Sequence, residues 1–516
     1  MKSGRSLATP LALLAFAAAW SAGSCRDETP ESVVTVPRPP KVTPDYAGIV
    51  VPPNIAPLNF VIREPGRKYQ ARIHSVAGEA IEVVSKTGEM LIPANQWRDL
   101  LTHNAGQELH VDVCVKTEAG TWSRYQTIVN TIAREEIDPY LVYRYMTPSS
   151  YAGKPMRICQ RNLESFEEET VLDATSFGEG CVHCHTFIGN SPGRVLIGMR
   201  HISLPSATLY GHDGRVDKIG AKFGYTAWHP SGKIVAYSVN DVRQFFHNAR
   251  TEIHDVVDLD SAIFCYDIEQ SRIKTAPALA DRKRLETYPA WTPDGKVLYF
   301  CGAPLLWTGS ETVPPARYRE VKYDLMRISY DIETDRWGPL ETVLRAADTG
   351  LSILLPRVSP DGRFLLFCMA EYGCFPIYQP TSDLYLMDLR TGAYRKLPIN
   401  SEYAEAWHSW SSNSRWIVFS SKREGGVFTR TFISHVDADG QAGKPFLLPQ
   451  RRASFYDSCY CLYNMPELVA GPVPLDAKTL IRAAIGSTQI HVDSVTGATP
   501  KISSTETYRT GEASVQ

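Results

Sequence analysis

The five residues Cys181-Val182-His183-Cys184-His185 form the segment of this sequence with the most definite chemistry. Two thiols separated by two residues can reach the two vinyl groups on one edge of a porphyrin, and a histidine directly after the second thiol can turn its imidazole under the ring to bind iron. Thioethers from Cys181 and Cys184, with His185 as the proximal ligand, are the combination found in c-type cytochromes. The spacing therefore predicts one covalent haem c, held by Cys181 and Cys184 and ligated by His185.

Three other interpretations of the two thiols stay open. Zinc requires four nitrogen or sulfur ligands, and no second CxxC or HxxxH pair accompanies Cys181 and Cys184 in the sequence. A CxxC redox pair belongs beside a βαβ pattern, of which the sequence has no sign. A disulfide between Cys181 and Cys184 is the plainest alternative in an exported protein, and it leaves His185 without a role.

The sixth position on the iron is open between Met199 and His201. Residues 195–201 predict a strand that begins 10 residues after His185, and alternation places Met199 and His201 on the same face of it. A thioether would raise the potential of the iron and an imidazole would lower it. The competing interpretations are a core side chain for Met199 and a hydrogen-bonded loop residue for His201. We expect His183, inside the attachment loop, to face solvent. Further candidates for the sixth position are His212, His229 and His408.

The N-terminus predicts the export that haem c attachment requires in bacteria. Lys2 and Arg5 precede an apolar run over residues 7–20. This run is too short to be a membrane-spanning helix on its own and is followed by small residues, which is the pattern of a secretory signal. We therefore expect residues 1–24 to be a signal peptide.

Cys25 closes this signal in the sequence Ala22-Gly23-Ser24-Cys25, which resembles a lipobox. Cleavage before Cys25 would allow its acylation and would anchor the chain to a membrane, whereas the alternative is ordinary cleavage that leaves Cys25 in a loose tail. Arg26-Asp27-Glu28 resembles the acidic surface-export tag of lipoproteins in some Gram-negative bacteria. We therefore expect an exported protein of the periplasm or cell surface, and specifically an outer-membrane lipoprotein.

The composition excludes several classes of protein. The 516 residues carry 54 basic and 56 acidic side chains, a formal charge of −2. Phosphate backbones select a basic excess, so we expect no nucleic-acid partner. With 43% hydrophobic residues the chain can bury real cores, which excludes disorder of the whole. Beyond the signal, no apolar run reaches the length of a membrane span, which excludes channels and transporters.

The second half of the chain repeats a turn close to Trp-x-Pro-Asp-Gly-Lys, with Ser for Asp in the first copy and Val for Trp in the third, and an apolar strand follows each time. The copies are Trp228–Lys233, Trp291–Lys296, Val358–Arg363 and a degenerate Trp410–Arg415, with the first three prolines 63 and 67 residues apart. A period of this size predicts four-stranded blades that close into a propeller. The repeats resemble those of TolB-like six-bladed propellers over about residues 190 to 480, which implies six blades where four are clear from the sequence.

Side chains within the repeats have structural explanations. Asp294 and Asp361 lie in Pro-Asp-Gly turns, where an aspartate caps its own backbone, so we expect no catalytic role for them. Trp228, Trp291 and Trp410 open the repeats, and we expect them to pack between blades rather than to form sugar-stacking platforms.

Around this propeller, the sequence predicts a mainly β chain with a defined domain order. Eight prolines between residues 25 and 57 predict an extended tether after the lipidated Cys25. Short alternating segments predict a small β-sandwich at 58–135. A haem c attachment segment is expected at 136–190, the TolB-like propeller at 191–485, and a flexible Ser/Thr-rich tail at 486–516.

Four segments carry a wider resemblance: Ile137–Arg144, Gln160–Phe166, the motif at 181–185, and Tyr456–Ser458 with Tyr463–Glu467. Together they resemble a family of exported bacterial lipoproteins that join a CxxCH segment to a TolB-like propeller. Proteins of this family are often described as TolB-like translocation or cytochrome c biosynthesis proteins. The resemblance spans nearly the whole mature chain and implies the domain order, but a family label is not a mechanism.

Taken together, these patterns predict a cytochrome c-like electron carrier anchored to the envelope through Cys25. Its haem would pass electrons, while the propeller positions it against a redox partner protein or a small ligand. The alternative is a non-redox propeller that binds a partner as an adaptor, with Cys181 and Cys184 in a disulfide. A third possibility is a haem enzyme with an open sixth position, such as a peroxidase. No G-x-S-x-G or HExxH sequence indicates a hydrolase, so the prediction leans away from an enzyme.

Overall fold

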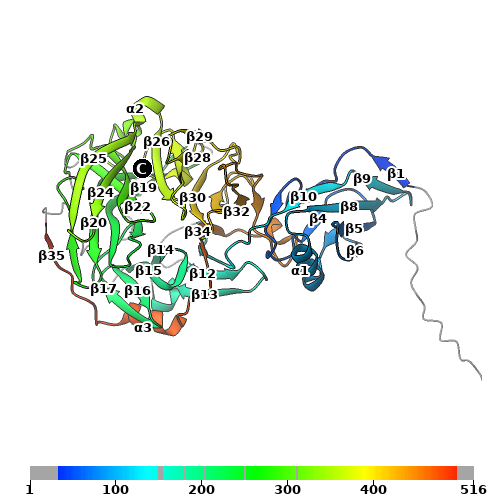
Figure 1. Ribbon diagram of the computed structural model, residues 1–516, viewed down its shortest axis with the longest axis horizontal. Coiled ribbons are helices and arrows are strands. Elements are labelled where there is room, and N and C mark those ends of the chain that lie inside the picture. The colour runs from blue at the N-terminus through cyan, green and yellow to red at the C-terminus, as the bar shows by residue number, and fades with distance from the viewer. Residues whose placement is uncertain are drawn as a thin grey trace, which may run out of the picture.

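The computed structural model describes residues 33–148, 155–178, 180–201, 204–248, 252–279, 281–308 and 312–496. These residues form a small lobe at one side and a larger ring of sheets (Figure 1). The expected signal peptide and Cys25 lie outside the described residues. Within the described part, no helix is long and apolar enough to cross a bilayer.

The small lobe contains a seven-stranded sheet and a three-stranded sheet. In the larger sheet β8 pairs with β5, β9 and β10, and its alternating residues Leu109, Val111, Val113 and Val115 are buried. Alternation of this kind turns one face of a strand toward the core. The elements are β1 (Val33–Val36), β2 (Val42–Thr43), β3 (Val50–Val51), β4 (Phe60–Ile62), β5 (Lys68–His74), β6 (Ile81–Ser85), β7 (Glu89–Met90), α1 (Ala94–His103), β8 (Glu108–Lys116), β9 (Trp122–Tyr125) and β10 (Ile128–Ile132).

Residues 33–57 are part of this lobe and not an extended tether. β1 lies parallel to β9, β2 pairs with β4, and β3 lies parallel to β10. Pro40, Pro44 and Pro52 are buried between these short strands. Proline cannot donate to a ladder, so it separates brief edge pairings without preventing them. The proline content therefore reflects short strands at sheet edges. Residues 25–32 of the predicted tether lie outside the described residues.

The ring consists, within the described residues, of five four-stranded sheets and one of five strands. All pairings inside the four-stranded sheets are antiparallel. The sheets are β13-β12-β11-β34, β14-β15-β16-β17, β18-β19-β20-β21-β35, β22-β23-β24-β25, β26-β27-β28-β29 and β30-β31-β32-β33.

The strands of the first half of the ring are β11 (Tyr140–Met146), β12 (Met156–Asn162), β13 (Glu168–Asp173), β14 (Gly180–Ile188), β15 (Ser191–His201), β16 (Ala207–His212), β17 (Arg215–Ile219), β18 (Thr226–Trp228), β19 (Ile234–Phe246), β20 (His254–Asp267) and β21 (Arg272–Lys274). Those of the second half are β22 (Arg284–Trp291), β23 (Val297–Pro304), β24 (Asp324–Asp331), β25 (Arg336–Leu344), β26 (Ser352–Val358), β27 (Phe364–Ala370), β28 (Asp383–Asp388), β29 (Tyr394–Lys396), β30 (Glu405–Trp410), β31 (Trp416–Ser421), β32 (Arg430–His435), β33 (Phe446–Leu447), β34 (Leu462–Val469) and β35 (Asp493–Thr496).

Residues 136–190 do not form a separate attachment segment. They supply β11, β12 and β13 to one sheet and β14, with its five-residue motif, to the next. β34 returns from the far end of the ring and pairs with β11, so the first strand of the ring shares a sheet with a strand near its C-terminal end. This pairing closes the ring by joining segments more than 300 residues apart, a contact that local sequence patterns do not reveal.

The predicted tail is also paired in part. Within the predicted tail at 486–516, β35 lies parallel to β21. Helix α3 (Ala477–Ile485), which precedes the tail, buries Leu480 and Ala484 in the core cluster that includes the β14 sheet. Backbone pairing to an edge strand needs no apolar periodicity, so the Ser/Thr-rich sequence gave no sign of it. Residues 497–516 lie outside the described part.

The four sequence repeats share one turn geometry. The residue before the proline, or its equivalent, donates its N–H to the first residue of the next strand, as in Thr292 to Val297 (2.9 Å) and Ser411 to Trp416 (2.8 Å). Gly362 has φ +71°, a left-handed conformation that favours glycine. In the degenerate copy Ser414 adopts the same conformation with φ +61°, and its hydroxyl accepts the N–H of Asp361 at 3.0 Å. The fourth copy is therefore a true repeat.

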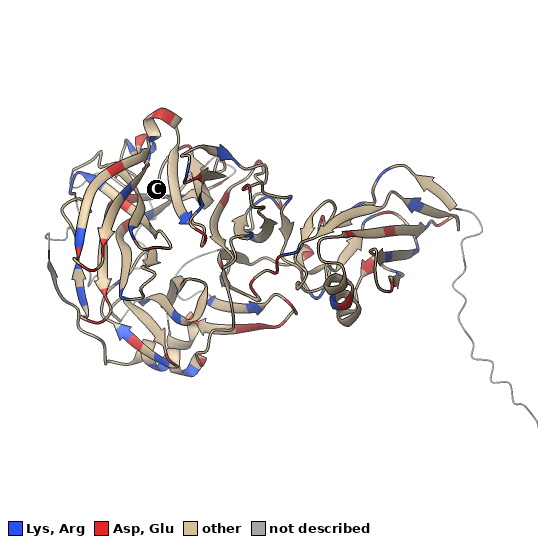
Figure 2. Cartoon of the chain, viewed as in Figure 1, with Lys and Arg blue, Asp and Glu red and all other residues tan. Residues whose placement is uncertain are grey.

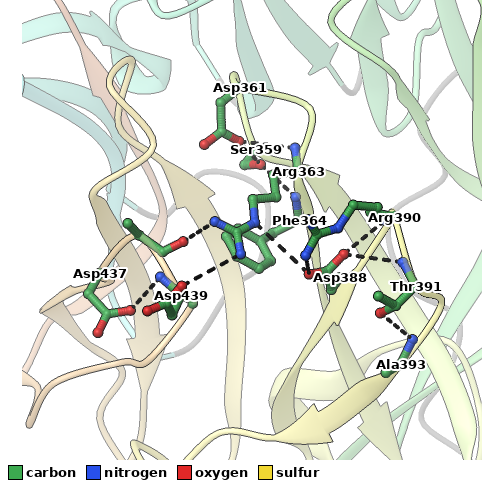
Figure 3. Close-up of polar contacts among 12 residues, drawn as sticks. Ser359, Asp361, Arg363, Phe364, Asp388, Arg390, Thr391, Ala393, Asp437 and Asp439 are labelled. Atoms are coloured by element: carbon green, nitrogen blue, oxygen red, sulfur yellow. Dashed lines mark hydrogen bonds and ion pairs between the residues drawn. The ribbon is translucent and has the colours of Figure 1, made fainter.

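Asp361 has the structural role that its turn predicts (Figure 3). Its Oδ1 accepts from the hydroxyl of Ser359 at 2.6 Å and from the N–H of Arg363 at 3.1 Å. The guanidinium of Arg363 then lies over the ring of Phe364, 3.8 to 3.9 Å from carboxylates of Asp388 and Asp439. This surface network ties one sheet to the next.

The small lobe and the ring share one hydrophobic core. Trp416 and Val418 of β31 belong to the same buried cluster as Ile73 and Val113 of the small lobe. The indole of Trp416 also donates to the carbonyl of Glu135 at 3.1 Å. Basic and acidic residues are interspersed along the chain in both lobes (Figure 2). The two lobes therefore pack as parts of one folded unit.

Candidate functional site on the ring axis

The first strands of the sheets carry a recurring irregularity near the axis. One residue in each of five strands has a positive φ and lies at a break in the strand register. Such a bulge re-aims the side chains that follow it. The five residues are Cys184 (48°), Tyr288 (56°), Leu355 (55°), Trp407 (51°) and Met465 (54°).

The series of five bulges shows where the predicted haem motif lies. Cys184 occupies the bulge position of β14, and His185 is the residue directly after it. The corresponding residues of other sheets are Pro289, Pro356, His408 and Pro466. The motif is therefore one variant of the repeated inner strand, placed on the axis of the ring.

A cavity of about 370 Å³ lies on that axis. It is lined by residues of β14, β18, β22, β26, β30 and β34, which are the inner strands of all six sheets. His185 and His408 line it together with Arg357, Glu467 and tryptophans. Its volume is at the lower end of the range for small-ligand pockets.

His185 presents a buried imidazole to this cavity. Both ring nitrogens are buried without a hydrogen-bond partner among the described residues. Nε2 lies 4.0 Å from the carboxylate of Glu467. Burial, with the positive charge of Arg144, lowers the pKa of His185 to about 4, although the backbone carbonyls of Val142 and Met465 lie near enough to oppose the shift, so the ring is neutral at neutral pH. A neutral imidazole with an unused nitrogen is the form that binds a metal.

The two thiols of the motif are in no disulfide, and both residues are half-buried. Cys181 lies with its Sγ 3.5 Å from the Sδ of Met156 on the neighbouring sheet. Burial raises the pKa of Cys184, an effect that Arg200 and Arg144 oppose. Among the described residues no cluster of three or more His, Cys, Asp or Glu side chains could hold a metal ion, and this gives the zinc interpretation no further ligands.

His183 does not face solvent as expected. Its residue is 4% exposed and both ring nitrogens are buried without partners. β15 makes room for the ring at Gly198, where an added Cβ would lie 2.5 Å from the imidazole Cε1. Strand alternation and the bulge decide which side chains turn inward. The expectation for His183 used only its place within the motif, and it was therefore wrong.

The structure does not bring Met199 or His201 to the axial cavity. Met199 pairs opposite Val182 and is fully buried in a core cluster. His201 pairs opposite Gly180, and its Nδ1 accepts the N–H of Leu204 at 3.1 Å. Met199 is thus a core side chain and His201 a hydrogen-bonded residue at the end of β15, in line with the competing interpretations of these two residues.

Of the three further histidines, His408 shares the cavity with His185. Its Nε2 lies 3.1 Å from the carbonyl oxygen of Leu366 and its Nδ1 3.7 Å from the thiol of Cys368. His212 stacks on Tyr210 and bonds Asp217 on an outer strand. His229 contacts the carbonyl of Gly295 in a repeat turn. Both nitrogens of His408 are therefore engaged by the protein.

Arg357 and Glu467 are functional candidates that sequence reasoning missed. They lie two residues after the bulges at Leu355 and Met465, each preceded by a proline, where the aligned sheet at Tyr288 has Ala290. The feature of the sequence that could have identified them is their charge, because they occupy an inner-strand position of a repeat. Glu467 accepts the N–H of Phe187 at 3.0 Å, and burial raises its pKa to about 7.

The tryptophans that open the repeats do pack between sheets. The indole of Trp228 donates to the carbonyl of Thr186 at 3.4 Å, and that of Trp410 to the carbonyl of Arg357 at 3.1 Å. Each bond joins the inner strands of neighbouring sheets. Trp228, Trp291 and Trp410 also line the cavity, so the same side chains that hold the ring together form its inner wall.

Four-stranded antiparallel sheets arranged in a ring around an axial cavity define a β-propeller-like fold. No protein-family model matches the sequence. No curated protein matches it either.

Several solved structures are similar to this chain at low identity. Oligogalacturonate lyase from Vibrio parahaemolyticus is 11% identical, with a TM-score of 0.32, over 73% of this chain and 100% of its own. The Synechocystis apocarotenoid oxygenase is 11% identical, with a TM-score of 0.34, over 80% of this chain and 92% of its own. Hydrazine synthase from Kuenenia stuttgartiensis is 14% identical, with a TM-score of 0.29, over 50% of this chain and 64% of its own. The site must therefore be interpreted from the geometry of this chain alone.

Proposed function

We propose that this chain is a c-type cytochrome-like lipoprotein of the cell envelope, in which one covalent haem is held at Cys181, Cys184 and His185 for electron transfer. In this proposal the six sheets are the six blades of a TolB-like propeller, and the small lobe is a β-sandwich beside it. The propeller serves as the scaffold that meets a redox partner protein or a small ligand.

The observation that carries the proposal is the state of His185. A buried polar ring with two unpartnered nitrogens costs free energy unless a further group satisfies it. Here that ring follows a CxxC pair at the spacing of haem attachment, and both thiols are free. The donor types are therefore those of a haem c, with two thiols for thioethers and a neutral imidazole for iron, and of these three residues His185 is the one that lines the axial cavity.

The roles of the residues follow from their surroundings. A bound haem would supply one-electron redox chemistry. Cys181 and Cys184 would hold it covalently, and the bulge at Cys184 aims His185 at the axis. Burial keeps the imidazole of His185 unprotonated down to a pH of about 4. The tryptophan-lined wall restricts the access of water to this side chain.

The test is the spectrum and mass of the full-length protein made in a bacterial host that matures c-type haem. We expect a reduced α band, a c-type pyridine haemochrome, and an intact mass that includes one haem. A colourless protein with bare or bridged thiols would exclude electron transfer by this motif. In the same spectrum of the mature chain, acyl mass on Cys25 tests the lipid anchor, and cell fractionation tests the outer-membrane location.

A second candidate is a non-redox envelope adaptor that binds a ligand or partner through its propeller, with Cys181 and Cys184 in a disulfide. The axial cavity favours a binding role, because it brings charged and polar side chains into an apolar wall. A thiol count on the denatured chain separates free from bridged cysteines. A peroxidase-like enzyme would need an open sixth position, and carbon monoxide binding to the reduced protein tests for that.

A further inference from the structure

We propose that the axial cavity is a binding site for a small organic carboxylate, with the guanidinium of Arg357 as its anchor. This inference does not depend on haem attachment. It names the ligand class of the cavity, which neither candidate function specifies. The observations that carry it are an unpaired cation, a set of unused donors and the size of the space.

Arg357 is a half-buried cation that lacks a counter-ion. Its side chain lines the cavity, yet it makes no hydrogen bond or ion pair within the described part of the chain. Glu467 attracts it electrostatically, but no contact within 4.0 Å joins the two. An unpaired charge in a largely desolvated place destabilises a fold, so its retention indicates a function.

Other polar groups on the same wall are also unsatisfied, and they are donors. The indole Nε1 atoms of Trp291 and Trp407 and the hydroxyl of Ser409 are buried without a partner, and all three residues line the cavity. Indole N–H groups can only donate. Two indole donors and a hydroxyl that share a cavity with a guanidinium favour a ligand that is rich in acceptors and negatively charged.

The carboxylate class follows from shape and size. A guanidinium presents a planar fork that binds a carboxylate through two parallel hydrogen bonds. The remaining wall includes apolar surface from Phe187, Ile188 and Trp228, which suits a carbon skeleton better than a hydrated inorganic ion. A space of about 370 Å³ admits a molecule of a few rings at most.

The experiment uses benzoate and its neutral isostere benzamide as probes. The full-length chain, prepared without haem from a host that lacks the maturation system, is titrated by calorimetry and by tryptophan fluorescence. We expect saturable binding of one benzoate per chain, with benzamide weaker by about 10-fold or more. The variant R357M is expected to weaken benzoate binding by about 10- to 100-fold, because a charge-assisted bond is lost.

Stability gives a readout that a structural role for Arg357 would not produce. Because R357M removes an unpaired charge, its melting temperature without ligand should rise by about 2 °C. The matched control is R363M in the same sheet, which lies in the surface network of Figure 3 and should bind benzoate like the wild type. Wild-type affinity in R357M, or a fall in its melting temperature, would overturn the proposal.

The haem content of protein from a maturing host separates this inference from the proposed function. Haem attachment without any benzoate binding by the wild-type chain would refute the carboxylate site and leave the cytochrome proposal standing. Benzoate binding that depends on Arg357, in a protein that never acquires haem, would support the carboxylate site and favour the adaptor.

Discussion

Burial controls the protonation of several side chains of the ring. Desolvation lowers the pKa of His185 to about 4 and that of His408 to about 3. It raises the pKa of Asp258, Glu286 and Glu467, each to about 7. Desolvation disfavours the charged form in every case, so burial keeps these imidazoles neutral and raises the pH at which these carboxyls ionise.

Under the proposed function, the change H185A would remove the proximal iron ligand. Without that imidazole, we expect haem loading to fall and any bound haem to lose the six-coordinate low-spin spectrum. Absorption spectra of the reduced and oxidised protein measure this. H212A is the control, because His212 bonds Asp217 on an outer strand and does not line the cavity. An unchanged low-spin spectrum in H185A would assign the ligand to another residue.

Asp258 should make the free energy of unfolding fall as the pH rises. Its side chain accepts from Asn240 at 2.7 Å, and burial raises its pKa from 3.8 to about 7. Between these values the folded chain binds a proton that the unfolded chain has lost, so the free energy of unfolding declines from about pH 4 to pH 7. D258N should flatten this decline by roughly 2 to 4 kcal/mol.

Urea denaturation at pH 5 and pH 8 measures this slope. The control is D213N, since Asp213 is an exposed turn residue with φ +47°, which asparagine also tolerates. If D258N keeps the wild-type dependence on pH, Asp258 is ionised in the folded chain and the assigned direction is wrong.

At the scale of single elements, the inner strand β14 depends on its neighbour β15. The motif is held by pairings from Gly180 to Phe187 on one side, with a break between His183 and Thr186. The buried ring of His183 fills the space that a side chain at position 198 would need. The position of the thiols and of His185 therefore depends on a glycine in the adjacent strand.

G198A should displace β14 without altering any residue of the motif. The added methyl would lie 2.5 Å from the His183 ring and 3.1 Å from its carbonyl oxygen. Overpacking of this kind costs about 1 to 3 kcal/mol, and we expect haem loading to fall as well. Haem per chain and the urea midpoint measure the two effects. G193A, where the nearest atom lies at 3.8 Å, is the control. Full loading and stability in G198A would show that the strand adjusts freely.

At the scale of the whole molecule, two long-range contacts hold the chain together. β34 pairs with β11 and closes the ring, and the small lobe shares its core with β31 of the ring. Trp416 is fully buried in that shared core and bonds Glu135, which precedes β11. We therefore expect the lobes to unfold as one cooperative unit.

W416A should destabilise both lobes together. Truncating a fully buried tryptophan leaves a cavity and costs about 3 to 5 kcal/mol. Calorimetry of the wild type should show one transition, and in W416A that single transition should move to lower temperature. Y394A, at a 41% exposed residue of β29, should change little. A separate, unshifted transition for the small lobe in W416A would show that the lobes fold independently.

Local patterns in the sequence identified the repeats because each is defined within a few residues. The turn at Asp361 and its strand have local hydrogen bonds, and even Ser414 could be assigned from its place in the series. The position of the haem motif could not be predicted in this way. Its strand resembles the other inner strands only once the bulge at Cys184 is seen, and a bulge leaves no clear mark on composition.

The sequence alone determined the mainly β character, the repeated blade-like units and the five-residue motif, because turns, alternation and ligand spacing are encoded over short distances. Only the tertiary structure decided that His185 lines the axial cavity, that the strands β1 to β3 and β11 to β14 belong to sheets, and that Arg357, His185 and Glu467 line one cavity. These relations depend on pairings between distant segments, such as β11 with β34, whose free energy comes from burial across the whole ring and not from any local preference.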